Sequence, residues 1–213
     1  MKIGFDFRLG GIHNGGIGRY SSELFLHVIK QYHKDEFYIF FHPKNIRGEE
    51  LVPFASFKNV KFIPAPFRHY SIAEQIGFPR LLEKYNLDIV HFPNFNVPVR
   101  YKGKFVVTIH DVVHHRLSGH KKKNLLYFYG YKYVIEQAIK NSQKIITVSE
   151  SSKADIVSLF KVPEGKVEVI YEGVSTRTVD DEFTERVRQQ FLLPRPYFLF
   201  AGVLERKKNI VML

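Results

Sequence analysis

The sequence predicts an α/β fold in which a parallel sheet is covered by helices on both faces. Strand-like and helix-like segments alternate along most of the 213 residues. The strand candidates are continuous apolar runs, a pattern typical of parallel strands buried on both faces. Together these patterns indicate a Rossmann-like domain, and such sheets bind ligands at the carboxyl ends of their strands.

The elements follow one another in a regular order. The strand candidates are Lys2–Phe7, Phe37–Phe41, Val60–Ile63, Asp88–Phe92, Lys104–Ile109, Lys144–Val148 and Val167–Tyr171. The helix candidates are Tyr20–Ile29, Ile72–Tyr85, Leu125–Ala138 and Ser149–Phe160. We expect Gly77 and Pro79 to kink or split the second helix, because proline lacks an amide donor and clashes with the preceding turn.

The pattern changes after Tyr171. Residues 172–182 are polar and lack periodic apolar residues, which suits a linker. A helix is expected over Phe183–Leu193 and a strand over Tyr197–Val203. We assign an amino-terminal domain to residues 1–171, a linker to 172–182 and the start of a second domain to 183–213. A lone strand–helix unit cannot bury its apolar faces, so we expect the chain to be a fragment.

Composition excludes several classes of protein. The chain has no cysteine, so disulfides, thiolate metal sites and cysteine catalysis are excluded. No apolar run approaches the roughly 18–20 residues that span a bilayer, and the first residues do not resemble a signal peptide, so we expect a soluble, cytoplasmic protein. The net charge of +11 favours anionic partners such as nucleic acid, acidic lipid or phosphorylated substrates, or is simply a solvated basic surface.

A glycine-rich segment, Gly15–Gly18, joins the first strand to the first helix. Amide groups at a helix amino terminus favour an anion, and glycine lets a phosphate approach closely. The alternative is a connection that binds nothing. The dinucleotide fingerprint fits poorly, because the second strand has no acidic residue after it to hold a ribose. We expect Gly15 and Gly16 to contact phosphate or sugar.

A histidine-rich segment follows the strand Lys104–Ile109, at the edge where ligands are expected. It contains His110 and Asp111, with His114 and His115 close behind. A histidine there can exchange hydrogen bonds near neutral pH, and an adjacent carboxylate can orient it. The same residue types suit a metal site, and structural hydrogen bonding at a strand end is a third interpretation. The segment alone leaves all three open.

Three other segments have both a structural and a functional interpretation. Ser149 suits a helix N-cap and Glu150 the first turn, but both could face a ligand. Lys121–Lys123 precede an aromatic helix, which fits contact with an anionic membrane or a buried helix with a solvated start. Arg206 and Lys208 follow a strand, where clustered cations suit a diphosphate or an exposed basic loop.

Read in order, six segments resemble the retaining glycosyltransferases of family four, which have the GT-B fold of two facing Rossmann-like domains. The segments are GGIGRYSSEL, DIVHFPNF, VVTIHDVVHH, KIITVSESSKADI, VEVIYEGVS and YFLFAGVLERKKNI. The resemblance implies transfer of a sugar from a nucleotide diphosphate to an acceptor with retention of configuration. It implies no metal and no other cofactor.

The resemblance also implies roles for individual residues. His110 would contact the transferred sugar beside Asp111, and Lys208, with Arg206, would neutralise the leaving diphosphate. The donor phosphates would lie near Gly15 and Gly16. The acceptor-side cleft would be formed by Asn94, Asn96, Ser149 and Glu150. We expect specificity for the acceptor to depend on the loops Asn94–Arg100 and His114–Asn124.

The chain departs from the family pattern at several places. Val203 follows Gly202 where the family often has arginine, and Glu172 replaces an asparagine before the linker glycine. The paired-glutamate segment that grips the donor nucleotide is missing. We therefore expect the 213 residues alone to bind donor weakly and to catalyse little or nothing.

Two other functions remain open. One is a metal-dependent hydrolase that uses His110, Asp111, His114 and His115, although the adjacent pair would point apart in an extended segment. The other is a basic module that binds a polyanion or a membrane surface, which depends on net charge alone. For the transferase the expected partners are a nucleotide sugar and a glycan or lipid-linked acceptor, with peripheral membrane contact left open and no nucleic acid.

Overall fold

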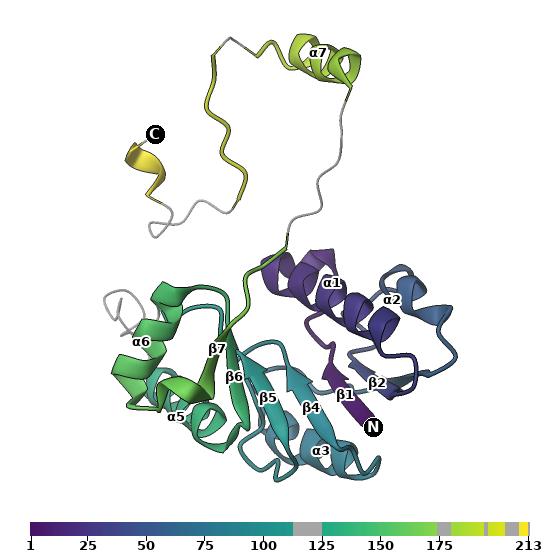
Figure 1. Ribbon diagram of the computed structural model, residues 1–213, viewed down its shortest axis with the longest axis vertical. Coiled ribbons are helices and arrows are strands. Elements are labelled where there is room, and N and C mark those ends of the chain that lie inside the picture. The colour runs from purple at the N-terminus through teal and green to yellow at the C-terminus, as the bar shows by residue number, and fades with distance from the viewer. Residues whose placement is uncertain (113–124, 174–179, 194–195, 203–208, 213) are drawn as a thin grey trace. The chain divides into compact units, whose positions relative to one another are not determined.

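A computed structural model describes residues 1–112, 125–173, 180–193, 196–202 and 209–212 (Figure 1). The chain divides into two units, Met1–Glu172 and Gly173–Leu213. Each unit is described by itself.

The first unit is built on a sheet of seven strands that are all parallel. The strands are β1 (Lys2–Asp6), β2 (Glu36–Phe41), β3 (Val60–Pro64), β4 (Ile89–Phe92), β5 (Phe105–Thr108), β6 (Lys144–Thr147) and β7 (Val167–Val169). Their order across the sheet is β3-β2-β1-β4-β5-β6-β7. The order reverses between β1 and β4, the switch point at which open α/β sheets bind ligands. The predicted α/β fold is confirmed.

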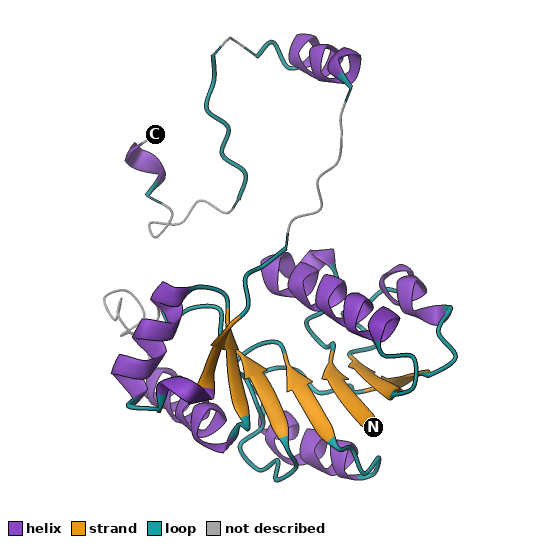
Figure 2. Ribbon diagram, viewed as in Figure 1, coloured by secondary structure: helices purple, strands orange, loops and turns teal. Residues whose placement is uncertain are grey.

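Helices pack on both faces of this sheet (Figure 2). The helices of the first unit are α1 (Gly15–Gln31), α2 (Gly48–Ala55), α3 (Ile72–Glu83), α5 (Leu125–Asn141) and α6 (Glu150–Phe160). Short 3₁₀ turns, η1 (Ile12–Asn14) and η2 (Glu164–Lys166), precede α1 and β7. Side chains along a strand alternate between faces, so Phe37 and Ile39 of β2 join the core under α1 and α2. Tyr38 and Phe40 join the core that contains side chains of α3, α5 and α6.

The sequence prediction and the structure differ over two helices. Helix α1 begins at Gly15 rather than Tyr20, so the glycine-rich segment forms its first turn. Helix α2 was not predicted, because it is short, begins at Gly48 and contains Pro53. Pro53 is past the first turn, so it removes one hydrogen bond of the helix, and the buried ring of Phe54 holds α2 on the core.

Helix α3 is continuous over Ile72–Glu83, so the expected split at Gly77 and Pro79 does not occur. The ring of Phe67 occupies the space that a Cβ at Gly77 would need. Pro79 is itself buried, and the neighbouring Phe78 is fully enclosed in the core. Tertiary packing therefore outweighs the poor helix propensity of this segment.

The second unit contains α7 (Asp181–Gln190) and a short 3₁₀ turn, η4 (Ile210–Met212). The Asp180 side chain caps α7 by accepting a hydrogen bond from the Phe183 amide. The strand predicted over Tyr197–Val203 does not form in its described part, residues 197–202. Phe198 is 87% exposed and Leu199 is 80% exposed, because no described residue of this unit pairs with the segment. A parallel strand needs such a neighbour to satisfy its backbone groups.

Candidate functional site

His110 lies at the carboxyl edge of the sheet, two residues after the end of β5. The backbone of Ile109 continues beside β6, with its amide 2.8 Å from the Ile146 carbonyl oxygen. Thr147 Oγ1 donates to the Ile109 carbonyl at 2.8 Å. These bonds extend β5 by one residue and place His110 at the edge, as the sequence predicted.

The His110 side chain contacts three other segments. Its Nε2 lies 3.1 Å from the Pro93 carbonyl oxygen, so this nitrogen must carry a hydrogen. Its Nδ1 lies 3.4 Å from Glu172 Oε1, beyond the end of β7. The ring meets that of Tyr20 from α1 edge-on, with centroids 4.8 Å apart. We call His110, Tyr20, Pro93 and Glu172 the His110 junction, together with Ser152, which bonds the His110 carbonyl. Both ring nitrogens face oxygen acceptors, and the side chain is 20% exposed, so the imidazole is oriented yet reachable.

A hydrogen-bonded chain runs from the His110 junction into the core. The Tyr20 hydroxyl is 3.0 Å from Thr108 Oγ1, which is 2.8 Å from Nε2 of His91 on β4. Burial, with a contribution from the nearby charge of His110, lowers the pKa of His91 to about 4. His91 is therefore neutral at physiological pH and acts as a structural member of the chain. Burial also raises the pKa of the Tyr20 hydroxyl.

The first turn of α1 presents open backbone. Gly15 has a φ of 64°, and an added Cβ at Gly15 or Gly16 would meet no atom within 4 Å. Gly18 is different, because a Cβ there would collide with the Gly11 carbonyl oxygen. Gly16 lies one turn before Tyr20 on the same helix face, so its amide is on the side of α1 that carries the contact with His110. The geometry is compatible with the predicted approach of an anion.

Helix α6 begins at the same edge. Ser149 is its N-cap, accepting from the Ser152 amide at 3.1 Å and donating to Ser152 Oγ at 3.1 Å. Ser152 Oγ in turn donates to the His110 carbonyl at 3.0 Å. Glu150 is exposed in the first turn. The capping interpretation is thus confirmed, and a ligand contact by Ser149 or Glu150 stays a prediction.

The loop after β4 carries the two predicted asparagines. Asn94 Oδ1 accepts from the amide of Phe95 at 2.8 Å, which shapes the loop. The Asn96 side chain is 2% exposed, and its Nδ2 donates to Glu74 Oε1 on α3 at 2.8 Å. The structure brings this loop to His110 through the Pro93 carbonyl.

Sequence reasoning missed a buried charge cluster beside this loop, formed by Asp6, Arg8 and Glu74. Arg8 is fully buried, with Nε 2.8 Å from Asp6 Oδ1, Nη2 2.7 Å from Asp6 Oδ2 and Nη1 2.8 Å from Glu74 Oε1. Burial works to raise the pKa of Asp6, but Arg8 outweighs it and the pKa is lowered. Burial raises the pKa of Glu74, and Arg8 and Asn96 offset this only in part. We call this set the Arg8 cluster.

Glu172 and Ser152 were also missed as partners of His110. The sequence showed Glu172 only as a departure from the family asparagine, and no local pattern indicates that it reaches a histidine 62 positions earlier. The order of the strands could have indicated these contacts. β4, β5, β6 and β7 are parallel neighbours, so the residues that follow each of them lie at the same edge of the sheet.

Several predicted residues lie outside the described residues. They are His114, His115, Lys121, Lys122, Lys123, Arg206 and Lys208. The hydrolase, membrane and diphosphate-neutralising hypotheses that depend on them stay predictions. Asp111 is described and exposed, directly after His110. In the part of the chain that the structure describes, no three His, Asp or Glu side chains are grouped as a metal site would require.

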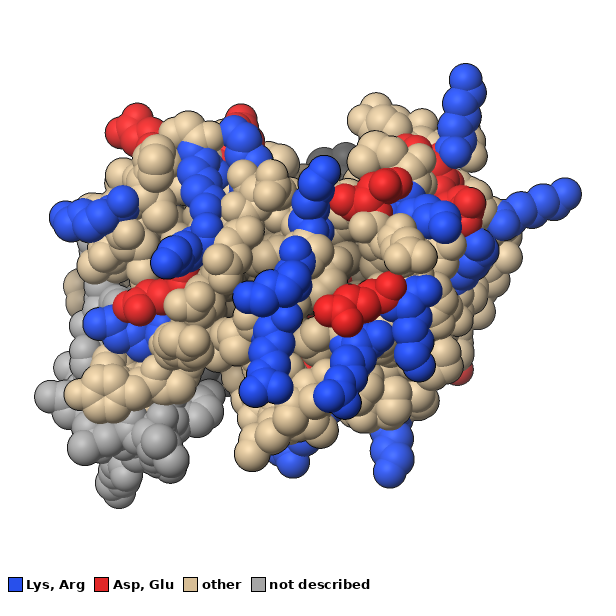
Figure 3. Space-filling view, turned by 90° about the horizontal axis from the view of Figure 1, so that it is seen from below, with Lys and Arg blue, Asp and Glu red and all other residues tan. Residues whose placement is uncertain are grey.

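Many of the described lysines lie at the edge of the sheet where the strands begin, opposite the His110 junction. Figure 3 views the molecule from below in Figure 1, the side on which β1 begins, and Lys and Arg outnumber Asp and Glu there. Lysines at helix ends and strand starts on this side include Lys2, Lys30, Lys84, Lys104, Lys140, Lys144 and Lys161. Cations at helix carboxyl ends are favoured by the helix dipole, so much of this charge has a structural explanation.

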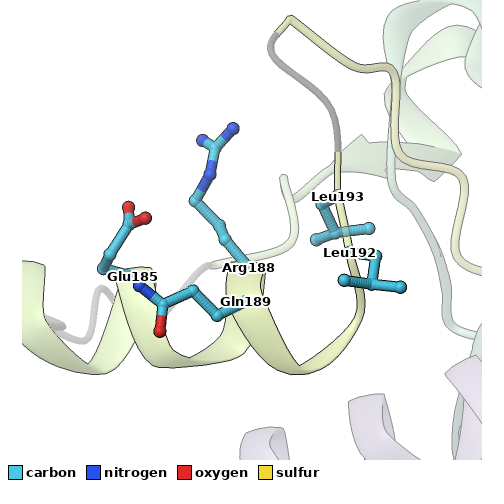
Figure 4. A pocket seen from close by; sticks show the side chains of 5 residues that line it. All are labelled: Glu185, Arg188, Gln189, Leu192 and Leu193. Atoms are coloured by element: carbon cyan, nitrogen blue, oxygen red, sulfur yellow. The ribbon is translucent and has the colours of Figure 1, made fainter.

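A hollow of about 350 Å³ lies beside α7 in the second unit. It is lined by Glu185, Arg188, Gln189, Leu192 and Leu193, all from α7 and the residues that follow it (Figure 4). Leu192 is 87% exposed, so the hollow is an open surface depression. It contains none of the predicted site residues. Across the described helices, none has both the length and the apolar character to cross a membrane.

Comparison with known proteins agrees with the geometry. The chain is 28% identical over 133 residues to the O-antigen chain mannosyltransferase B of Escherichia coli, covering 61% of this chain and 34% of that protein. It is 30% identical over 128 residues to an uncharacterized glycosyltransferase of Methanocaldococcus jannaschii, covering 57% of this chain and 32% of that protein. The matched residues thus span about a third of each relative's length.

The sequence profile of Glycosyltransferase Family 4 matches residues 14–178. This range contains α1 with its open first turn, the His110 junction and Glu172. Because the match covers most of the chain, and because its sheet has the parallel order and the edge site described above, the chain belongs to glycosyltransferase family 4.

Proposed function

We propose that this chain forms the acceptor-side domain of a two-domain glycosyltransferase, which transfers a sugar from a nucleotide diphosphate to a hydroxyl acceptor with retention of configuration. The observation that carries the proposal is the His110 junction. An oriented, partly exposed imidazole lies at the carboxyl edge of a parallel sheet and contacts Tyr20, one turn after the open start of α1. This combination suits a sugar at His110 and a phosphate near Gly15 and Gly16.

In the proposed reaction, a hydroxyl of the transferred sugar hydrogen-bonds His110 Nδ1 in place of the exposed Glu172 oxygen. Nε2 keeps its bond to the Pro93 carbonyl, and Tyr20 supports the ring from the side of α1. The carboxylates of Glu172 and Asp111 add negative charge at the same edge, which would offset positive charge that develops on the transferred sugar. Arg206 and Lys208 would neutralise the leaving diphosphate. No metal or other cofactor takes part in this proposal.

The E. coli relative is a mannosyltransferase by name, so a nucleotide-diphosphate mannose is the first donor to test. Because the relatives are about three times as long as the matched segment, the activity is proposed for a longer protein that contains these residues. We expect the 213 residues alone to turn over little or no donor.

The test is a panel of nucleotide-diphosphate sugars incubated with the two-domain protein and a mixture of sugar acceptors, with donor loss and glycoside formation followed by mass spectrometry. The same samples are analysed for bound metal and treated with chelator. The proposal expects one donor to be consumed, with product formed and full activity in chelator. Absence of transfer from every donor, or hydrolytic activity that chelator removes, would contradict it. Steady turnover by the 213 residues alone would contradict the need for the second domain.

A further inference from the structure

A cavity of about 340 Å³ lies between the start of α3, the loop after β4 and α5. Its walls are mainly apolar and aromatic, from Tyr70, Ile72, Ile76, Tyr131 and Val134. The polar side chains among its described lining are Ser71, Gln75, Asn96 and Arg100, none of them acidic. A mostly apolar hollow with a few placed polar groups is the usual form of a small-molecule site.

Asn96 presents a buried acceptor at this cavity. Its side chain is 2% exposed, and Nδ2 donates to Glu74 Oε1 at 2.8 Å. A carboxylate oxygen accepts and cannot donate here, so the amide orientation is fixed and Oδ1 is the remaining atom. Oδ1 is buried and has no hydrogen-bond partner among the described residues. Buried acceptors are almost always paired, so we expect a donor from a bound molecule.

The Arg8 cluster holds Asn96 in this orientation. Glu74 Oε1 also receives Arg8 Nη1 at 2.8 Å, and Glu74 Oε2 accepts from the Tyr70 amide at 2.7 Å. Glu74 therefore cannot turn away without breaking a buried ion pair. A binding group supported by locked neighbours is preorganised for its ligand.

Two further polar side chains of the lining, Gln75 and Arg100, offer donors to the cavity. Gln75 Oε1 accepts from the Val99 amide at 2.9 Å, which leaves its Nε2 to donate. Ser71 is occupied as the N-cap of α3. Arg100 is exposed and forms no ion pair with any residue that the structure describes. An acceptor and a guanidinium that have no partner among the described residues, together with one amide donor, fit a ligand that has a hydroxyl and an acidic group.

The cavity is close to the His110 junction along the loop after β4. The Pro93 carbonyl accepts from His110 Nε2. Asn96 is three residues after Pro93, so the Cα atoms of Pro93 and Asn96 are at most about 11 Å apart. The transferred sugar at His110 cannot fill the cavity as well. An acceptor whose hydroxyl meets that sugar and which also reaches the cavity must be elongated.

We infer that this cavity binds the part of the acceptor that is remote from the reacting hydroxyl, and that this part is an anionic amphiphile. Its apolar atoms pack on Ile72, Ile76 and Val134, a hydroxyl donates to Asn96 Oδ1, and an acidic group meets Arg100. The inference rests on the proposed function, because that function defines the acceptor.

Binding is measured by titration calorimetry on the 213-residue chain, below micelle-forming concentrations. The probes are octyl glucoside, octyl glucoside 6-phosphate and inorganic phosphate. We expect the phosphorylated glycoside to bind about tenfold more tightly than octyl glucoside, as one charge-assisted contact implies, and inorganic phosphate to bind most weakly. Equal affinity for the two glycosides, or no binding of either, would overturn the inference.

Two variants locate the binding in the cavity. Gly130 is exposed on α5, lines the cavity and has open space where a Cβ would be added. Gly130→Leu should fill the cavity and abolish binding of both glycosides without loss of fold, because leucine favours a helix more than glycine. Gly48→Leu, at another open helical glycine outside the cavity lining, is its control. Unchanged binding in Gly130→Leu would exclude this cavity.

Arg100→Gln should weaken the phosphorylated glycoside about tenfold and leave octyl glucoside unchanged. Arg80→Gln, an exposed arginine in the last turn of α3, is the matched control and should change neither. Transfer by the two-domain protein separates the two proposals. Transfer that persists in Gly130→Leu with unaltered acceptor affinity refutes the cavity assignment alone. Cavity binding in a protein that transfers no sugar refutes the proposed function.

Discussion

The Arg8 cluster and the His110 junction lie at the same edge of one sheet, but they differ in exposure and in how their charges are paired. Arg8 is fully buried, and both of its carboxylate partners are within 2.8 Å. His110 is 20% exposed, and its carboxylate partner Glu172 is 54% exposed at 3.4 Å. A closed, paired cluster holds segments together, whereas an open titratable group can meet a substrate. The comparison indicates a structural role for the Arg8 cluster and supports the proposed chemical role of the His110 junction.

The largest effect should come from breaking the Arg8 cluster. Arg8→Met leaves the carboxylates of Asp6 and Glu74 buried without a cation, and we expect the unfolding free energy to fall by about 3–5 kcal/mol. Lys61→Met removes the ion pair between Lys61 and Glu36, whose side chains are 52% and 46% exposed, and should cost far less, because solvent screens an exposed pair. Urea denaturation of both variants makes the comparison. Equal losses would show that the Arg8 cluster does not hold the edge together.

The next effect depends on pH and tests the neutral state of His91. Its pKa is about 4 in the folded protein, below the ordinary value of 6.5, so the unfolded chain binds more protons between these pH values. Stability should therefore be complete above about pH 6.5 and fall as the pH drops towards 4, by about 3 kcal/mol for this residue. His91→Gln keeps a nitrogen near Thr108 and cannot titrate. A His91→Gln variant whose stability falls equally steeply over this range would contradict the assignment.

Substitutions at two glycines at the start of α1 should change stability by smaller amounts and in opposite directions. Gly18→Ala should destabilise by about 1–3 kcal/mol, because its Cβ meets the backbone oxygen of Gly11. Gly16→Ala enters open space and should stabilise the helix by about 0.5–1 kcal/mol. In the two-domain protein, Gly16→Ala should nevertheless weaken donor binding, because the added methyl group obstructs the expected phosphate. Thermal unfolding and donor titration of both variants separate these effects. Unchanged donor affinity in Gly16→Ala would remove this glycine from the site.

Most of the sheet could be predicted because parallel strands are buried on both faces and appear as apolar runs such as Phe37–Phe41. Helix α2 and the unbroken course of α3 could not, because Gly48, Pro53 and Pro79 oppose helix locally and only tertiary packing decides. The segment that begins at Tyr197 is the opposite case. It is an apolar run, but no described residue pairs with it, so it forms no strand and stays exposed.

The position of His110 at the edge followed from its place after a predicted strand. Its partners Tyr20, Ser152 and Glu172 could not be predicted, because each is distant in sequence and reaches His110 only after β-strand order is established. The Arg8 cluster could not be predicted for the same reason, because Glu74 on α3 is far from Asp6 and Arg8 in the sequence. Net charge pointed to anionic partners, but the described lysines gather largely at the other edge.

The most direct test of the proposed function is the turnover of His110→Ala in the two-domain protein with the donor that the wild type consumes. His27→Ala, an exposed histidine on α1, is the matched control. His110→Ala should keep its stability within about 1 kcal/mol, because the side chain is not part of the core. Its kcat should fall by about a hundredfold or more, as the loss of one preorganised contact to the reacting sugar implies, while His27→Ala retains full activity. Equal kcat values for the two variants would contradict the account.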